Sequence, residues 1–277
     1  MAASRLPAAA DENPLAGEVG IVAAVFGSHQ KKGALKLNDI PKVARDELDM
    51  RVVDMNTMNF TSLEPAVVDP FREAAESAGC VLTNLKMNQR GIDPGSADPE
   101  ARKHAVEVYK KSIDAAARMG MRWARPLPTP EKPEMSLLVE SFRELADYGG
   151  EKEVEILVEN FGWMQADPNS VVSLIEAVDR DLPASPDTGN WNSNEIRYPG
   201  LEKTFPLAAT CDFKAKTLGA DGQHAAYDLE RCFEIGWKAG FRGPWCIEHG
   251  HADFQQLLKN IGSVGDQLRA WIKDATA

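Results

Sequence analysis

Four acidic residues stand at the ends of apolar, strand-like runs in the second half of the chain, at Glu159, Asp187, Asp212 and Glu248. Each run is separated from the next by a segment long enough for a helix. Parallel strands connected in this way present their last residues at one edge of the sheet. Carboxylates crowded together repel one another unless a cation lies among them. The spacing therefore predicts a metal site at the mouth of a parallel barrel.

Strand-like and helical segments alternate along the whole chain. The acidic strands are predicted at 154–160, 182–187, 207–212 and 243–248, and the four earlier strands at 20–26, 51–56, 80–86 and 121–125. A first helix is predicted after a cap at Asn38 or Asp39, and later helices at 64–78, 98–119, 134–148, 169–179, 198–205, 225–239 and 254–275. Such alternation indicates parallel pairing with right-handed crossovers. Eight units in 277 residues favour a single (β/α)8 TIM barrel, with a doubly wound sheet as the alternative.

Composition limits the classes of partner and the location. A net charge of −11 argues against a nucleic-acid partner, which leaves a basic footprint on the proteins that bind it. The longest apolar run falls short of a membrane span. Residues 1–18 lack the basic start and apolar centre of a signal peptide, so we expect a flexible N-terminal arm, a barrel over 19–277 and a cytoplasmic protein.

Three of the acidic strands carry short motifs, Val158-Glu159-Asn160, Pro186-Asp187-Thr188-Gly189-Asn190 and Cys246-Ile247-Glu248. With these motifs in this order, the sequence resembles the xylose isomerase-like TIM barrels. This superfamily of sugar isomerases and epimerases also contains endonuclease IV. On the seventh strand the family usually has His-x-Lys, and this chain has Asp212-Phe213-Lys214.

The resemblance implies a divalent cation held by Glu, Asp, His and Glu from strands five to eight. Carried over to this sequence, the ligands are Glu159, Asp187 and Glu248, with Asp212 in place of the histidine. A set made only of oxygen ligands suits Mn²⁺ or Mg²⁺, with Co²⁺ and Zn²⁺ as alternatives. Lys214 follows Asp212 by two residues on the same strand face, so we expect it to offset the excess negative charge.

The implied function is that of a metal-dependent isomerase or epimerase acting on a small carbohydrate. Glu159 and Glu248 would remove and return a proton through an enediolate, with Lys214 as a further catalytic residue. Substrate contacts are expected from strand ends and the loops that follow them. The candidates are His29, Arg125, Trp163 and His249. Proteins of this kind are commonly dimers or tetramers, so a homo-oligomer is an open alternative.

Three other functions compete with this interpretation. The same enolate in a 3-keto-glycoside expels the aglycone by β-elimination, which would make the protein a lyase or deglycosidase. DNA repair requires a three-metal cluster rich in histidine, and this chain has five histidines in all. A barrel that has lost its metal and only binds ligands is supported by the replacement at Asp212 alone. Deuterium uptake from solvent without loss of an aglycone distinguishes the isomerase from the lyase.

Overall fold

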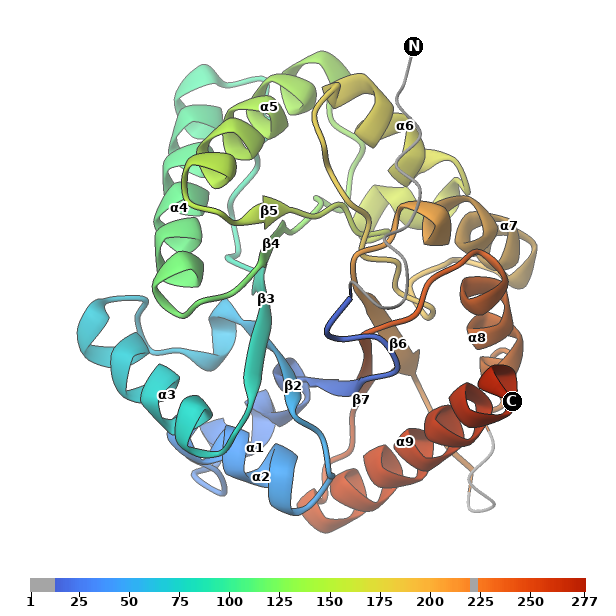
Figure 1. Ribbon diagram of the computed structural model, residues 1–277. Coiled ribbons are helices and arrows are strands. Elements are labelled where there is room, and N and C mark those ends of the chain that lie inside the picture. Colours follow the sequence, from blue (N-terminus) through green and yellow to red (C-terminus); the bar gives the residue numbers. More distant parts are fainter. Residues whose placement is uncertain (1–12, 220–223) are drawn as a thin grey trace.

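Helices surround a curved parallel sheet in the computed structural model, which describes residues 13–219 and 224–277 (Figure 1). Strands and helices alternate from β1 (Val19–Val22) to α9 (Phe254–Thr276). Most of the predicted N-terminal arm, residues 1–12, lies outside the described residues. None of the helices in the described ranges is both long and apolar enough to cross a bilayer.

Among the described residues, seven parallel strands form one sheet in the order β5-β4-β3-β2-β1-β7-β6. The strands after β1 are β2 (Val52–Asn56), β3 (Val81–Met87), β4 (Trp123–Pro126), β5 (Glu155–Ile156), β6 (Cys211–Ala215) and β7 (Trp245–His249). Isolated parallel bridges join Val158 to Ala184, Ala184 to Ala208 and Asp187 to Asp212. The segment 184–187 therefore lies between the two edge strands of the sheet, β5 and β6.

The strand predicted at 182–187 is present only as these bridges. Pro183 and Pro186 fall within it, and a proline has no N–H to donate to a strand ladder. The first predicted strand is also shorter than expected. After Val22 the chain turns into a 3-10 helix, η2 (Ala23–Phe26), and then into the short helix α1 (Gly27–Lys31), which carries His29.

The main helices lie within a few residues of the predicted segments. They are α2 (Ile40–Asp46), α3 (Pro65–Ser77), α4 (Pro99–Arg118), α5 (Met135–Glu151), α6 (Ser170–Val178), α7 (Asn194–Thr204), α8 (Leu229–Lys238) and α9. Local chemistry explains several of the starts. Asp98 caps α4 by accepting a hydrogen bond from the Glu100 N–H at 3.0 Å, and Asp253 caps α9 through the Gln256 N–H at 2.8 Å.

Two apolar clusters cover the two faces of the sheet. The larger one lies between the strands and the helices and includes Val53 and Ile247. The smaller one consists of Leu15, Val22, Val52, Trp123, Leu157 and Cys246. Side chains alternate along a strand. Val53 and Ile247 therefore point outward to the helices, and Val52 and Cys246 point to the inner face of the sheet. Two residues further along, the same strands carry Asp54 and Glu248. The inner face thus changes from apolar to charged toward the carboxyl ends of the strands.

Candidate active site

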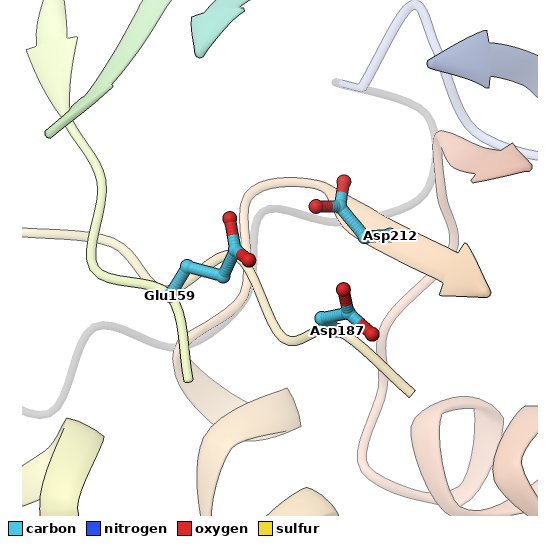
Figure 2. A group of neighbouring side chains, drawn as sticks. All are labelled: Glu159, Asp187 and Asp212. Carbon is cyan, nitrogen blue, oxygen red and sulfur yellow. The ribbon is translucent and has the colours of Figure 1, made fainter. Parts of the chain in front are cut away.

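Three buried carboxylates meet on the inner face of the sheet. Glu159, Asp187 and Asp212 each offer an oxygen atom, and these atoms lie within 4.8 Å of one another. Figure 2 shows the three side chains pointing toward one another. They come from the segment that follows β5, from the segment 184–187 and from β6, and their exposed fractions are 2%, 0% and 1%. The structure therefore brings together three of the four metal ligands expected from the sequence.

Glu248 lies nearer the solvent than the other three carboxylates. Its side chain is 27% exposed, and its Oε1 atom lies 2.7 Å from the Nζ atom of Lys214, which is 20% exposed. In the register of β6 with β7, Glu248 is opposite Lys214, whereas Asp212 is opposite Cys246. Two residues of strand advance the chain by about 6.6 Å. Asp212 therefore lies deeper in the barrel than Glu248. It is the second residue of β6 and not, as predicted, the last residue of a strand.

Three basic side chains enter the same region. The Nζ atom of Lys86 donates hydrogen bonds to both carboxylate oxygens of Asp212, at 2.6 and 2.5 Å. The Nε atom of Arg125 lies 2.7 Å from Oε2 of Glu159, in an ion pair that lacks the alignment of a hydrogen bond. Lys214 reaches Asp187 Oδ2 at 3.4 Å as well as Glu248. Lys214 therefore offsets negative charge at the site, as expected from the sequence, and the direct partner of Asp212 is Lys86, a residue of β3.

The charges in this region do not balance. Asp54 on β2 is fully buried beside Lys86, so five carboxylates face the three basic groups Lys86, Arg125 and Lys214. With all five carboxylates ionised, these groups of the described residues carry a formal charge of −2, which one divalent cation would neutralise. Burial raises the pKa of Asp187 to about 6 against the opposing charge of Lys214. A cluster of carboxylate oxygens with this deficit fits a hard divalent cation.

Opposite charges keep Lys86 and Glu159 ionised in spite of their burial. Burial opposes the charge of Lys86, but the Asp212 carboxylate outweighs it and keeps the pKa of Lys86 above its usual value. Burial likewise opposes ionisation of Glu159, but Arg125 and Lys86 lower the pKa of this carboxyl group. Glu159 is therefore ionised near neutral pH, as a proton acceptor or metal ligand must be.

Two asparagines that sequence reasoning did not assign hold the carboxylates in place. Asn160 Oδ1 accepts a hydrogen bond from the Asp187 N–H at 2.8 Å, and its Nδ2 atom donates to the Asp187 carbonyl at 2.9 Å. Asn190 donates to Glu159 Oε1 at 3.2 Å, while the backbone N–H groups of Gly189 and Asn190 donate to Asp187 Oδ1 at 2.6 and 2.9 Å. Both asparagines end a motif quoted above, which is the signal that identifies them.

The two candidate histidines contact the protein rather than the carboxylates. His29 is buried, its Nε2 atom lies 3.0 Å from the His251 carbonyl, and its ring packs on Phe254. His249 Nδ1 donates to the Ala215 carbonyl at 2.7 Å, because a carbonyl only accepts. Its Nε2 atom lies 2.9 Å from Asn260 Nδ2. Substrate binding by either histidine stays a prediction, and the contacts described here fix the loop between β7 and α9.

The other two substrate-binding candidates lie on the side of β4. Arg125, which is buried, reaches the carboxylate cluster through Glu159. Trp163 lies in the 3-10 helix η5 (Gly162–Ala166), where its ring faces the ammonium of Lys132 at 5.2 Å. It also lines a small apolar cavity of about 10 Å³ with Leu127 and Pro128. The structure thus places Arg125 at the cluster, whereas the contacts of Trp163 are with Lys132 and the apolar cavity.

Asp54 gives this region a testable dependence on pH. Its carboxylate accepts a hydrogen bond from Thr83, and burial raises its pKa above the ordinary value of 3.8 although Lys86 opposes the shift. Since the folded pKa is the higher one, the stability that Asp54 contributes is complete below pH 3.8 and is lost as the pH rises through the folded pKa.

Asp54→Asn keeps an acceptor for Thr83 and does not titrate. We expect the melting temperature of the variant, relative to that of the wild type, to increase as the pH is raised from about 4 to about 8. Each kcal/mol of this linkage corresponds to roughly 2–4 °C. Calorimetric melting curves across the range measure the difference. Parallel curves for the two proteins would contradict the assignment of a raised pKa to Asp54.

Comparison with known proteins places the chain in a family. A family model described as the xylose isomerase-like TIM barrel matches residues 46–274. The chain belongs to this family. No curated protein matches it significantly. The matched range contains β2 to β7 and every carboxylate described above.

Solved structures with the same fold carry names that refer to different activities. A xylose isomerase-like TIM barrel protein from Mycobacterium smegmatis, in complex with magnesium, is 17% identical, with a TM-score of 0.65 over 87% of this chain and 89% of its own. D-psicose 3-epimerase with D-tagatose, from Clostridium cellulolyticum H10, is 14% identical, with a TM-score of 0.69 over 92% and 99%. An AP endonuclease of family 2 from Brucella melitensis is 14% identical, with a TM-score of 0.63 over 83% and 91%. At these identities the likeness concerns the fold alone.

Proposed function

We propose that this protein is a divalent-metal-dependent sugar isomerase or epimerase that works by proton transfer at a carbon next to a carbonyl group. The observation that supports this most directly is the cluster of Glu159, Asp187 and Asp212, buried at the carboxyl ends of the strands with negative charge in excess. The magnesium complex and the epimerase with D-tagatose among the structural neighbours agree with the proposal. The net charge of −11 favours a sugar over nucleic acid as the substrate.

The cation would be held by Glu159, Asp187 and Glu248, with Asp212 as the fourth carboxylate. We infer that the segment 184–187, which bridges β5 and β6, completes the barrel as a strand-like segment beside the seven strands of the sheet. It thereby brings Asp187 to the cluster. When bound, a divalent cation polarises a carbonyl oxygen and lowers the pKa of the neighbouring C–H group. The oxygen donors favour Mn²⁺ or Mg²⁺.

Two carboxylates of the chain would transfer the proton. Glu159 and Glu248 come from different strands, with the segment 184–187 and β6 between them, so they reach a substrate from different sides. One carboxylate takes the proton and the other returns it. Lys214 and Arg125 supply positive charge toward the oxygen on which negative charge develops. The partial exposure of Glu248 and Lys214 marks the side from which the sugar enters.

The test is a panel of ketoses, aldoses and 3-keto-glycosides incubated with the Mn²⁺-loaded protein in D₂O. We expect deuterium at the carbon next to the carbonyl in at least one sugar, together with a new stereoisomer or positional isomer. Release of an aglycone would instead assign the protein to the lyases that act on 3-keto-glycosides. A panel with neither exchange nor cleavage would contradict the proposal.

The metal itself is a separate prediction. We expect the purified protein to contain about one equivalent of Mn²⁺, Mg²⁺, Co²⁺ or Zn²⁺ per chain, and the variant Glu159→Ala/Asp187→Ala to contain almost none, because it lacks two of the grouped carboxylates. Elemental analysis of both proteins after dialysis against each ion measures this. Equal metal content in the two proteins would show that the metal binds elsewhere.

A further inference from the structure

Lys86 holds an unusual place in the cluster. It belongs to β3, which is separated from β6 in the sheet by β2, β1 and β7, so its side chain crosses the interior to reach Asp212. Both side chains are almost fully buried, at 2% and 1% exposure, and both carboxylate oxygens of Asp212 accept from the same ammonium group. Water therefore cannot replace either partner, and each charge depends on the other.

Asp212 also belongs to the group of three carboxylates whose oxygens lie within 4.8 Å of one another (Figure 2). A divalent cation bound to Asp212 would lie about 4–5 Å from an ammonium group that is hydrogen-bonded to the same carboxylate. At that separation in a protein interior, two cations repel each other strongly. The Asp212 carboxylate therefore cannot bind the Lys86 ammonium group and the divalent cation fully at the same time.

We propose that Lys86 and the divalent cation are alternative counter-ions of Asp212, so that Lys86 is a positioning residue that weakens and tunes metal binding. This inference rests on the proposed metal centre. In the metal-free protein Lys86 neutralises Asp212 and makes the buried carboxylate tolerable. Metal binding then requires the ammonium group to withdraw from Asp212 or to share it.

The test is the affinity of metal-free protein for Mn²⁺, measured by titration calorimetry, and it needs no substrate. Lys86→Gln removes the charge but keeps an N–H donor for Asp212. We expect this variant to bind Mn²⁺ at least about tenfold more tightly than the wild type. Lys110→Gln is the matched control, because Lys110 pairs with Glu144 at 2.6 Å on the surface and the change in net charge is the same. The control should bind Mn²⁺ as the wild type does.

A second variant separates competition for Asp212 from a general effect of charge. Lys86→Gln/Asp212→Asn removes both partners and restores the net charge, so we expect it to lose the gain in affinity. Melting curves with and without MnCl₂ accompany the titrations. If Lys86→Gln unfolds in the absence of metal, Mn²⁺ should restore its folding, and a variant that stays unfolded with Mn²⁺ would count against the proposal.

The outcomes distinguish this inference from the proposed function. If the wild type binds Mn²⁺ and Lys86→Gln binds it equally or more weakly, the competition is refuted and the metal centre stands. If only Lys86→Gln binds Mn²⁺, the competition is supported, and the wild-type protein is not a metal enzyme. If neither protein binds any of the divalent ions, both proposals are overturned.

Discussion

Glu159→Gln is expected to lower the rate of deuterium incorporation into the substrate by at least about 10³-fold. The amide has nearly the shape of the carboxylate, so the substitution tests chemistry rather than packing. It removes a group that accepts the proton and an oxygen anion of the grouped carboxylates. It also leaves Arg125, which is buried, without the carboxylate 2.7 Å from its Nε atom. The measurement is the exchange rate under single-turnover conditions in D₂O.

Glu248→Gln provides the comparison for the second proton carrier. We expect a similar loss of exchange, although Glu248 is partly exposed and lies outside the group of three carboxylates. A surface control is Glu144→Gln, whose partner is Lys110, and it should exchange at the wild-type rate. Near wild-type exchange in Glu159→Gln or Glu248→Gln would show that the site has been assigned wrongly.

Asp212→Ala is expected to lower the free energy of unfolding of the metal-free protein by about 3–5 kcal/mol. The reason is Lys86, whose ammonium group would remain buried with neither of the oxygen atoms that now accept its hydrogen bonds. Glu159 and Asp54 also lie near Lys86, but Glu159 pairs with Arg125, and Asp54 is buried and hydrogen-bonded to Thr83. Urea unfolding of metal-free protein, followed by circular dichroism, measures the loss.

Two comparisons make this prediction specific. Glu144→Ala breaks the surface pair with Lys110 and should cost no more than about 1 kcal/mol. Lys86→Met/Asp212→Leu replaces both buried partners by apolar groups, and we expect most of the stability lost in Asp212→Ala to return. The idea would fail if the double variant were as unstable as Asp212→Ala, or if Asp212→Ala cost no more than the surface control.

The alternation of strands and helices follows from local patterns in the sequence. The helix predicted at 98–119 is observed as α4 (Pro99–Arg118), because apolar residues recur on one face, Asp98 caps the start and Gly120 follows the end. The acidic ends of the runs at Glu159 and Glu248 were also readable, since an apolar strand that ends in a carboxylate is unusual.

The first and last residues of the strands in the second half of the chain were harder to predict from the sequence. The apolar run 207–212 suggested a strand ending at Asp212, but the structure has the 3-10 helix η6 (Phe205–Leu207), the bridge residue Ala208 and then β6 starting at Cys211. An apolar run shows that a segment is buried and does not show which residues pair with the next strand. Asp212 consequently lies deeper than expected, and Lys214 takes the level of Glu248.

The sequence by itself thus determined the family resemblance, the approximate order of elements and the acidic residues of the site. Only the tertiary structure decided which charges meet. Lys86 and Asp212 are 126 residues apart, and nothing in either local sequence points to the other. Their pairing depends on the register of β6 with β7 and on the curvature of the sheet that brings β3 opposite β6. Register and curvature arise from packing of the whole chain, so a local motif cannot specify them.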